Sequence, residues 1–218
     1  MIEPYPIPAN EARSELIVSA SRFIASAGPA FSVEQARAFI ERIRNEFADA
    51  THHVTAFLIG FGPSTIAHCS DAGEPAGTAG KPVLSVLRGS GLGDIVMVVT
   101  RYFGGTKLGS GGLVRAYSDS ARAVLAVMPR AVKRATYTAM LVAPYTFFER
   151  IRLLIAQHHG VILNEVFAAD VTLTFRFPVD EFESFQKKLA ELSAGALSAE
   201  IIETNLATIL PLDPPFFI

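Results

Sequence analysis

A glycine-rich segment lies between an apolar run and an amphipathic helical pattern, and it restricts the folds open to this chain. The run Ile95–Thr100 is rich in β-branched residues and predicts a strand. From Leu113 onward, apolar residues recur at helical spacing, at Leu113, Tyr117, Ala121, Val124 and Leu125. The connection between the two holds Gly104, Gly105, Gly109, Gly111 and Gly112. The chain therefore turns sharply here from a buried strand into a helix.

The same connection has the composition of an anion-binding loop. Glycine has no Cβ, so backbone N–H groups can approach a ligand closely, and a helix that begins near Gly112 would direct its free N–H groups there. Nearby Lys and Arg residues would add positive charge. We expect an anion- or nucleic-acid-binding surface formed by Lys81, Arg101, Gly104, Gly105, Lys107, Gly109, Gly111, Gly112 and Arg115. A strand-to-helix turn without a ligand is the alternative.

Two familiar nucleotide-binding loops do not match this segment. A Walker loop needs Lys and then Ser or Thr directly after its closing glycine, whereas Gly109 is followed by Ser110 and Gly111. The dinucleotide fingerprint lacks its third glycine, because Val114 stands at that position. We expect no cofactor.

Charge is distributed unevenly along the chain, whose formal net charge is -2. Residues 1–80 hold 5 basic and 9 acidic residues, and residues 135–218 hold 5 and 10. Residues 81–134 hold 9 basic residues against Asp94 and Asp119, a local net charge of +7. A basic middle between acidic flanks favours a patch that contacts phosphate, RNA or an acidic protein surface, with a solvated helix face as the alternative.

Cys69 is the only cysteine, which excludes an intramolecular disulfide and a multi-cysteine metal site. No apolar run approaches about 18 residues, and the amino-terminal residues lack the pattern of a secretory signal. We expect a cytoplasmic protein that is monomeric and does not contact a membrane.

The first part of the chain predicts an α+β domain over residues 1–130. Leu16–Ile24 predicts a strand, and Ser32–Gln35 is a capping box that begins a helix. Val54–Phe61 and Thr65–Cys69 predict a hairpin, and Lys81-Pro82 begins a short helix. 

Residues after Pro129 predict a second unit. Their strands and helices follow the order β-α-β-β-α-β of the ferredoxin-like split βαβ fold. The strands are expected at 136–142, 161–167, 171–177 and 197–204, and the helices at 145–158 and 180–192. Residues 130–134 are interpreted as a basic linker, 135–205 as the second domain and 206–218 as a tail, which could dock on a neighbouring face or stay loose.

Several separated motifs together resemble the IMPACT/YigZ family. They are Ser21–Ile24, Asp49–His52, Gly73–Pro82, Val98–Gly105, Lys107–Gly109 and Gly111–Tyr117. The resemblance covers about residues 15–205 and implies an amino-terminal domain like the second domain of a small-subunit ribosomal protein, followed by a ferredoxin-like domain. It also implies a role in translation, since eukaryotic relatives regulate translation during amino-acid starvation.

The chain departs from the family pattern at one acidic position. The usual Ser-Asp-Asp-Gly-Glu-Pro is here Ser70-Asp-Ala-Gly-Glu-Pro75, so one carboxylate is missing. Asp71 and Glu74, with His52, form a possible secondary polar site. A divalent cation would require several oxygen ligands, so we favour capping of backbone groups or pairing with Arg101 or Lys81, and expect no metal.

Three functions follow from these patterns. The first is a translation-associated protein that contacts RNA, the ribosome or an acidic translation-related partner through the basic glycine-loop patch. The second is a protein-interaction adapter that binds no nucleic acid. The third is a hydrolase that uses Asp71 and Glu74. It ranks lowest because no complete set of catalytic residues can be assembled from the sequence.

Overall fold

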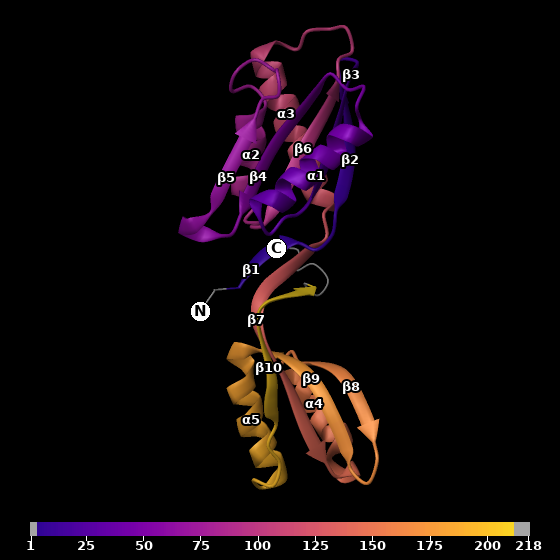
Figure 1. Ribbon diagram of the computed structural model, residues 1–218, viewed down its shortest axis with the longest axis vertical. Helices are drawn as coiled ribbons and strands as arrows, with labels where there is room; N and C mark the ends of the chain where they lie inside the picture. Colours follow the sequence, from indigo (N-terminus) through magenta and orange to yellow (C-terminus); the bar gives the residue numbers. More distant parts are fainter. Residues whose placement is uncertain (1–3, 212–218) are drawn as a thin grey trace. The chain divides into compact units, whose positions relative to one another are not determined.

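The computed structural model describes residues 4–211, which divide into one compact unit of residues 5–132 and a second of residues 133–210. Both units combine helices with antiparallel sheets, so the α+β class predicted from the sequence is confirmed (Figure 1). Across the described residues, no helix is long and apolar enough to cross a membrane.

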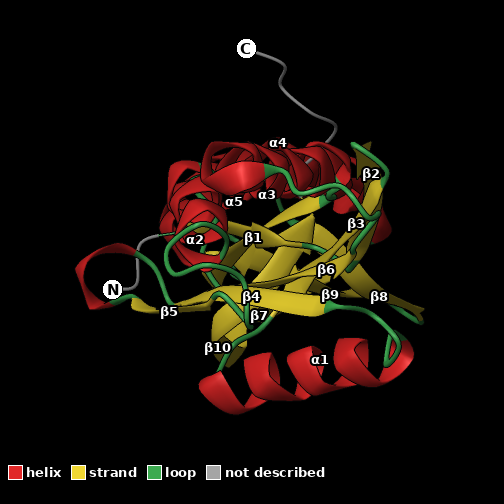
Figure 2. Ribbon diagram, turned by 90° about the horizontal axis from the view of Figure 1, so that it is seen from above, coloured by secondary structure: helices red, strands yellow, loops and turns green. Residues whose placement is uncertain are grey.

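The first unit is built on one antiparallel sheet with helices on both faces. The strands follow the order β2 (Ala12–Val18), β3 (Ser21–Pro29), β6 (Ile95–Tyr102), β4 (His52–Ile59) and β5 (Ile66–Ser70). Helix α1 (Val33–Glu46) covers one face, while α2 (Gly80–Gly89) and α3 (Gly109–Val127) cover the other (Figure 2). A short strand, β1 (Tyr5–Pro8), packs through Ile7 against Ala131.

The central strands of this sheet are buried on both faces, which explains their nearly continuous apolar sequences. In β4, Val54, Ala56 and Leu58 pack beneath α2 and α3, whereas Phe57 and Ile59 pack beneath α1. Successive side chains of a strand point to opposite faces, so a strand between two helical layers needs apolar residues at every position. 

Helix α1 begins as the capping box predicts. The Ser32 hydroxyl accepts a hydrogen bond from the Gln35 backbone N–H at 3.2 Å, and the Gln35 side chain accepts one from the Phe31 N–H at 2.8 Å. Helix α3 buries Leu113, Tyr117, Ala121, Val124 and Leu125, which is the apolar face read from the sequence, but it begins at Gly109 rather than near Gly112.

The predicted strand Leu16–Ile24 is instead a hairpin of β2 and β3. Its turn is formed by Ser19 and Ala20, whose φ angles are 45° and 65°. Neither is a glycine or asparagine, so the usual sequence signal for such a turn is absent.

The second unit follows the predicted β-α-β-β-α-β order. Its elements are β7 (Arg130–Ala143), α4 (Phe148–Gln157), β8 (Val161–Phe167), β9 (Val171–Pro178), α5 (Val179–Ser193) and β10 (Glu200–Pro211). Strands β7, β9 and β8 are paired in that order, and β10 pairs with β7. Phe175 and Phe177 of β9 pack against Phe185 of α5, with Ile151 and Ile155 of α4 in the same core. 

Two boundaries differ from the sequence interpretation. Residues 130–134 begin strand β7 and are not a free linker, and β10 continues through residues 206–211, which had been assigned to the tail. The rest of the expected tail, residues 212–218, lies outside the described residues.

Candidate functional site: a basic helical layer beside two glycine loops

The loop between β6 and α3 is fixed by a close backbone approach at Gly104. A Cβ on Gly104 would lie 2.1 Å from the Ala20 carbonyl, so only glycine fits there. The Gly104 N–H also donates a hydrogen bond to the Ser21 hydroxyl at 3.2 Å. Gly105 and Gly109 have φ angles of +85° and +70°, which favour glycine. The β2–β3 turn therefore holds this glycine loop in place.

Helix α3 follows the glycine loop and has an open amino terminus, meaning that no side chain caps its first N–H groups. The N-cap residue is Leu108, whose side chain cannot accept a hydrogen bond, and the first turn holds no acidic residue. Ser110 and Gly111 in that turn are exposed. A helix terminus of this kind presents N–H donors and positive dipole potential to an anion.

The amino terminus of α2 is satisfied differently. The Asp71 carboxylate accepts hydrogen bonds from the backbone N–H groups of Gly77 at 2.8 Å, Ala79 at 3.1 Å and Gly80 at 2.7 Å. Burial favours a higher pKa for Asp71, but these N–H donors and the charge of Lys81 together lower that pKa below its ordinary value. Asp71 therefore serves as an internal anion for α2.

Glu74 and Arg101 form a buried ion pair. Their side chains are only 4% and 5% exposed, and the Arg101 Nη1 atom lies 2.6 Å from Glu74 Oε1. The Tyr117 hydroxyl donates a second hydrogen bond to the same oxygen at 2.7 Å. The pKa of Tyr117 is raised, mainly because the hydroxyl is buried and also because it donates this hydrogen bond to Glu74.

Arg101 therefore departs from the expected anion-binding set. Arg101 continues the alternation of Met97 and Val99, so its side chain enters the core on the α2 and α3 side of the sheet. Its guanidinium is neutralised by Glu74 and also donates to the Ser21 hydroxyl at 3.3 Å. The residue positions the loop and does not offer a free cation to a ligand.

The possible secondary polar site at His52, Asp71 and Glu74 does come together around one loop. His52 Nδ1 donates a hydrogen bond to the Ala72 carbonyl at 2.9 Å, while its Nε2 atom lies 3.9 Å from Glu74 Oε1. Each of the three residues thus makes a hydrogen bond to another group of the protein. In residues 4–211, no group of three or more His, Cys, Asp or Glu side chains could hold a metal ion.

The remaining predicted cations, Lys81, Lys107 and Arg115, lie with three further basic residues on an exposed helical surface, which we call the basic layer. Its members are Lys81 and Arg88 of α2, Lys107 of the glycine loop, Arg115 and Arg122 of α3, and Arg130 at the start of β7. The same stretch contains two acids: Asp94 is 1% exposed, and Asp119 pairs with Arg122 at 2.7 Å. Positive charge therefore dominates the solvent side of α2 and α3.

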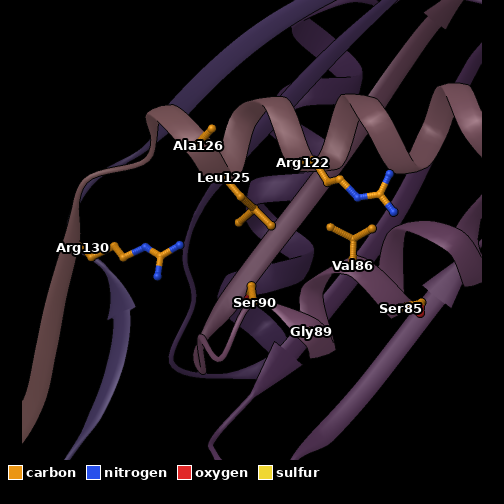
Figure 3. Close-up of a pocket in the computed structure, with 8 residues that line it drawn as sticks. All are labelled: Ser85, Val86, Gly89, Ser90, Arg122, Leu125, Ala126 and Arg130. Carbon is orange, nitrogen blue, oxygen red and sulfur yellow. The ribbon is translucent and has the colours of Figure 1, made fainter. Parts of the chain in front are cut away.

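A hollow of about 460 Å³ lies at the carboxyl-terminal ends of α2 and α3 (Figure 3). Figure 3 shows Leu125 between the side chains of Arg122 and Arg130, with Val86 of α2 below Arg122. Ser85, Gly89, Ser90 and Ala126 complete its lining. The basic layer thus contains an apolar strip as well as charge.

Sequence reasoning missed several members of these sites. Arg88, Arg122 and Arg130 were counted in the basic segment but were not assigned to the patch. Tyr117 was interpreted only as a core residue, although its hydroxyl binds Glu74. The role of Ser21 depends on the β2–β3 hairpin, for which the sequence carries no turn signal.

Comparison with known proteins identifies the family. A model described as the Impact N-terminal domain matches residues 19–125, and a domain of unknown function, DUF1949, matches residues 141–196. The IMPACT family member YigZ of Escherichia coli (strain K12) is 39% identical over 203 residues, covering 93% of this chain and 100% of that protein. This chain belongs to the IMPACT family. The family predicted from the motifs is confirmed.

Two further matches extend over nearly the whole chain. An IMPACT family member of Haemophilus influenzae is 36% identical over 200 residues, covering 91% of this chain and 97% of that protein. A crystal structure of a hypothetical protein, 39% identical, matches with a TM-score of 0.62 over 93% of this chain and 99% of that one. The segment matched by the Impact N-terminal domain contains the glycine loop, the Glu74–Arg101 pair and most of the basic layer.

Proposed function

We propose that this IMPACT family protein is a cytoplasmic, translation-associated regulatory protein that contacts RNA phosphates through the basic layer. The observation that carries the proposal is the exposure of Lys81, Arg88, Lys107, Arg115, Arg122 and Arg130 on one helical layer. Asp119 is the one exposed acid in the same stretch, and it is paired with Arg122. The association with translation rests on the family.

The open amino terminus of α3 supplies a second kind of phosphate contact. Its first-turn N–H groups face solvent beside Lys107 and Arg115, whereas the corresponding groups of α2 already bind Asp71. Backbone N–H groups and flexible cations position a phosphate chain without reading base identity. We therefore propose binding that depends weakly on RNA sequence through this surface.

A catalytic role is not part of this proposal. A hydrolase would need a carboxylate that is free to act on a substrate, but Asp71 accepts hydrogen bonds from backbone N–H groups and Glu74 is buried against Arg101. The arrangement supports binding.

A second candidate is an adapter that docks an acidic protein segment on the same surface. The hollow beside Arg122 and Arg130 favours it, because an apolar strip of Val86 and Leu125 suits a side chain better than a phosphate. A pull-down from lysate with and without nuclease treatment separates the two. Partners that survive the nuclease support the adapter, and partners that are lost support RNA contact.

The proposal predicts that the double substitution Lys107→Glu/Arg115→Glu weakens RNA binding at least about tenfold at low salt, since each lost phosphate contact costs affinity. Fluorescence anisotropy with a labelled RNA at 50 and 200 mM salt measures it. The matched control is Arg150→Glu/Lys187→Glu, which reverses the same amount of exposed charge in the second unit and should leave affinity unchanged.

The proposed RNA contact is wrong if the wild-type protein does not bind the labelled RNA at 50 mM salt. It also fails if both double variants weaken binding equally, because then total charge and not the basic layer would control affinity.

A further inference from the structure

A groove lies on the α1 face of the first unit's sheet, opposite the basic layer, between α1 and strands β4 and β5. Its volume is about 400 Å³. Its lining residues are Arg37, Ile40, Glu41, Arg44, Thr55, Phe57, His68 and Ser70. None of these residues belongs to the basic layer.

Strand register explains why the floor of this groove is continuous. Thr55 of β4 pairs with Ser70 of β5, and Phe57 pairs with His68, so the four side chains share one face. Helix α1 packs on Phe57 and on Val96 and Val98 of β6. The face of the edge strand β5 is therefore left uncovered.

An aromatic platform forms the centre of the floor. The His68 and Phe57 rings stack with centroids 5.2 Å apart and an interplanar angle of 28°. Phe57 is 4% exposed, whereas His68 is exposed and lines the groove. The Phe57 ring thus supports one face of His68. A flat ring supported on one side can take a nucleobase on the other.

The polar groups around the platform match the rest of a nucleotide. Ser70 lines the floor beside the rings and is partly exposed, whereas Thr55 is only 2% exposed and so is closed to a ligand. Arg37 and Arg44 line the wall from α1. Ser70 and these arginines supply hydrogen bonds for a base edge or ribose and a positive group for a phosphate.

The charge of this groove differs from that of the basic layer. Glu41 binds Arg44 at 2.7 Å, and Glu34 lies close enough to Arg37 to feel its charge. Acids and bases therefore nearly balance along this wall. Affinity in the groove depends on stacking and hydrogen bonds more than on phosphate neutralisation.

We propose that this groove holds one unstacked nucleobase of a single-stranded RNA, with the base on His68 and a flanking phosphate at Arg37. The inference rests on the proposed RNA-binding function and adds a preference for single-stranded over duplex RNA. Bases in a duplex are already stacked and paired, so they cannot enter the groove. The protein therefore prefers single strands, although its basic layer alone would bind duplex and single strand alike.

The test compares labelled A12 with a duplex RNA of the same length by fluorescence anisotropy. His68→Ala should weaken A12 binding about 5- to 150-fold, the range for loss of one base–aromatic stack, and should leave duplex binding and the salt slope unchanged. His68→Phe keeps a ring and should retain A12 affinity. Ile66→Ala is the matched control, because Ile66 is 53% exposed on the same face of β5 but does not line the groove.

The outcomes separate this inference from the function on which it rests. Equal wild-type affinity for A12 and duplex, or no loss of A12 binding in His68→Ala, overturns the groove while leaving the basic layer intact. Equal loss for A12 and duplex in His68→Ala also overturns it. AMP alone binding as tightly as A12 would overturn the assignment to RNA, and no binding of either RNA would overturn both proposals. Thermal unfolding of each variant shows that the fold is retained.

Discussion

At the scale of single residues, Glu74 joins three parts of the first unit. Its Oε1 atom accepts hydrogen bonds from Arg101 of β6 and Tyr117 of α3, while the residue itself belongs to the loop before α2. Removing one partner of a buried pair leaves the other charge without compensation. The pair thus positions both glycine-containing loops.

Glu74→Gln should lower the free energy of unfolding by about 3–5 kcal/mol, because it leaves the Arg101 charge unpaired in the interior. Urea unfolding measures this change. The matched control is Glu191→Gln, which breaks the exposed Lys188–Glu191 pair and should cost at most about 1 kcal/mol. Equal effects of the two substitutions would contradict the buried role of Glu74.

Asp71 makes stability depend on acid pH. Its pKa is lowered in the folded protein, so its stabilising contribution is complete above its unfolded pKa of about 4 and is lost as pH falls through the lower folded pKa. The difference in unfolding free energy between wild type and Asp71→Asn should therefore shrink below about pH 4. A difference that stays constant from pH 6 to pH 3 would show that the Asp71 charge does not stabilise α2.

Gly104 and Gly111 differ in the space that a side chain would find. A Cβ at Gly104 meets backbone atoms of Ala20 at 2.1 Å, whereas at Gly111 the nearest atom is the Arg115 Nη2 atom at 4.0 Å. Gly104→Ala should destabilise the protein, and Gly111→Ala should stabilise α3 by about 1 kcal/mol.

Thermal unfolding measures both effects, and RNA binding adds a second readout. If the α3 amino terminus contacts phosphate through a close backbone approach, Gly111→Ala weakens RNA binding while it raises the unfolding temperature. Unchanged RNA binding in the stabilised variant would argue against contact at that turn.

At the scale of elements, the sequence predicted a helix or strand correctly wherever its apolar residues followed a clear helical or strand spacing. Strand β8 occupies the predicted residues 161–167, and the capping box begins α1 as expected. The β2–β3 hairpin could not be predicted, because its turn uses Ser19 and Ala20 at positive φ. Strand β7 begins at Arg130, six residues before the predicted strand. The basic residues at its start favour a linker in the sequence, but they are compatible with a strand that lies beside β1.

The candidate site was predictable in composition but not in geometry. The sequence showed that positive charge gathers in residues 81–134, and Lys81, Lys107 and Arg115 are indeed exposed. It also favoured pairing of Asp71 or Glu74 with Arg101 or Lys81, and the Glu74–Arg101 pair agrees with that interpretation. It could not show that this pair is buried or that Tyr117 joins it, because Arg101 and Tyr117 lie 27 and 43 positions from Glu74 in the chain.

At the scale of the whole molecule, acidic flanks surround a basic middle, and the first unit displays that middle on one helical layer. The opposite face of its sheet carries the nearly neutral groove at His68. In the proposed RNA binding, the basic layer contributes affinity through charge and the groove contributes it through stacking. Salt concentration therefore distinguishes them.

The salt dependence of wild-type RNA binding tests whether the basic layer contacts phosphates. If about five cations of the basic layer neutralise phosphates, a plot of log affinity against log salt for duplex RNA should fall with a slope of about -4.5. Lys107→Glu/Arg115→Glu should reduce that slope by about 2. A slope near zero, or one that the double substitution leaves unchanged, would contradict the assignment of the basic layer as the RNA-binding surface.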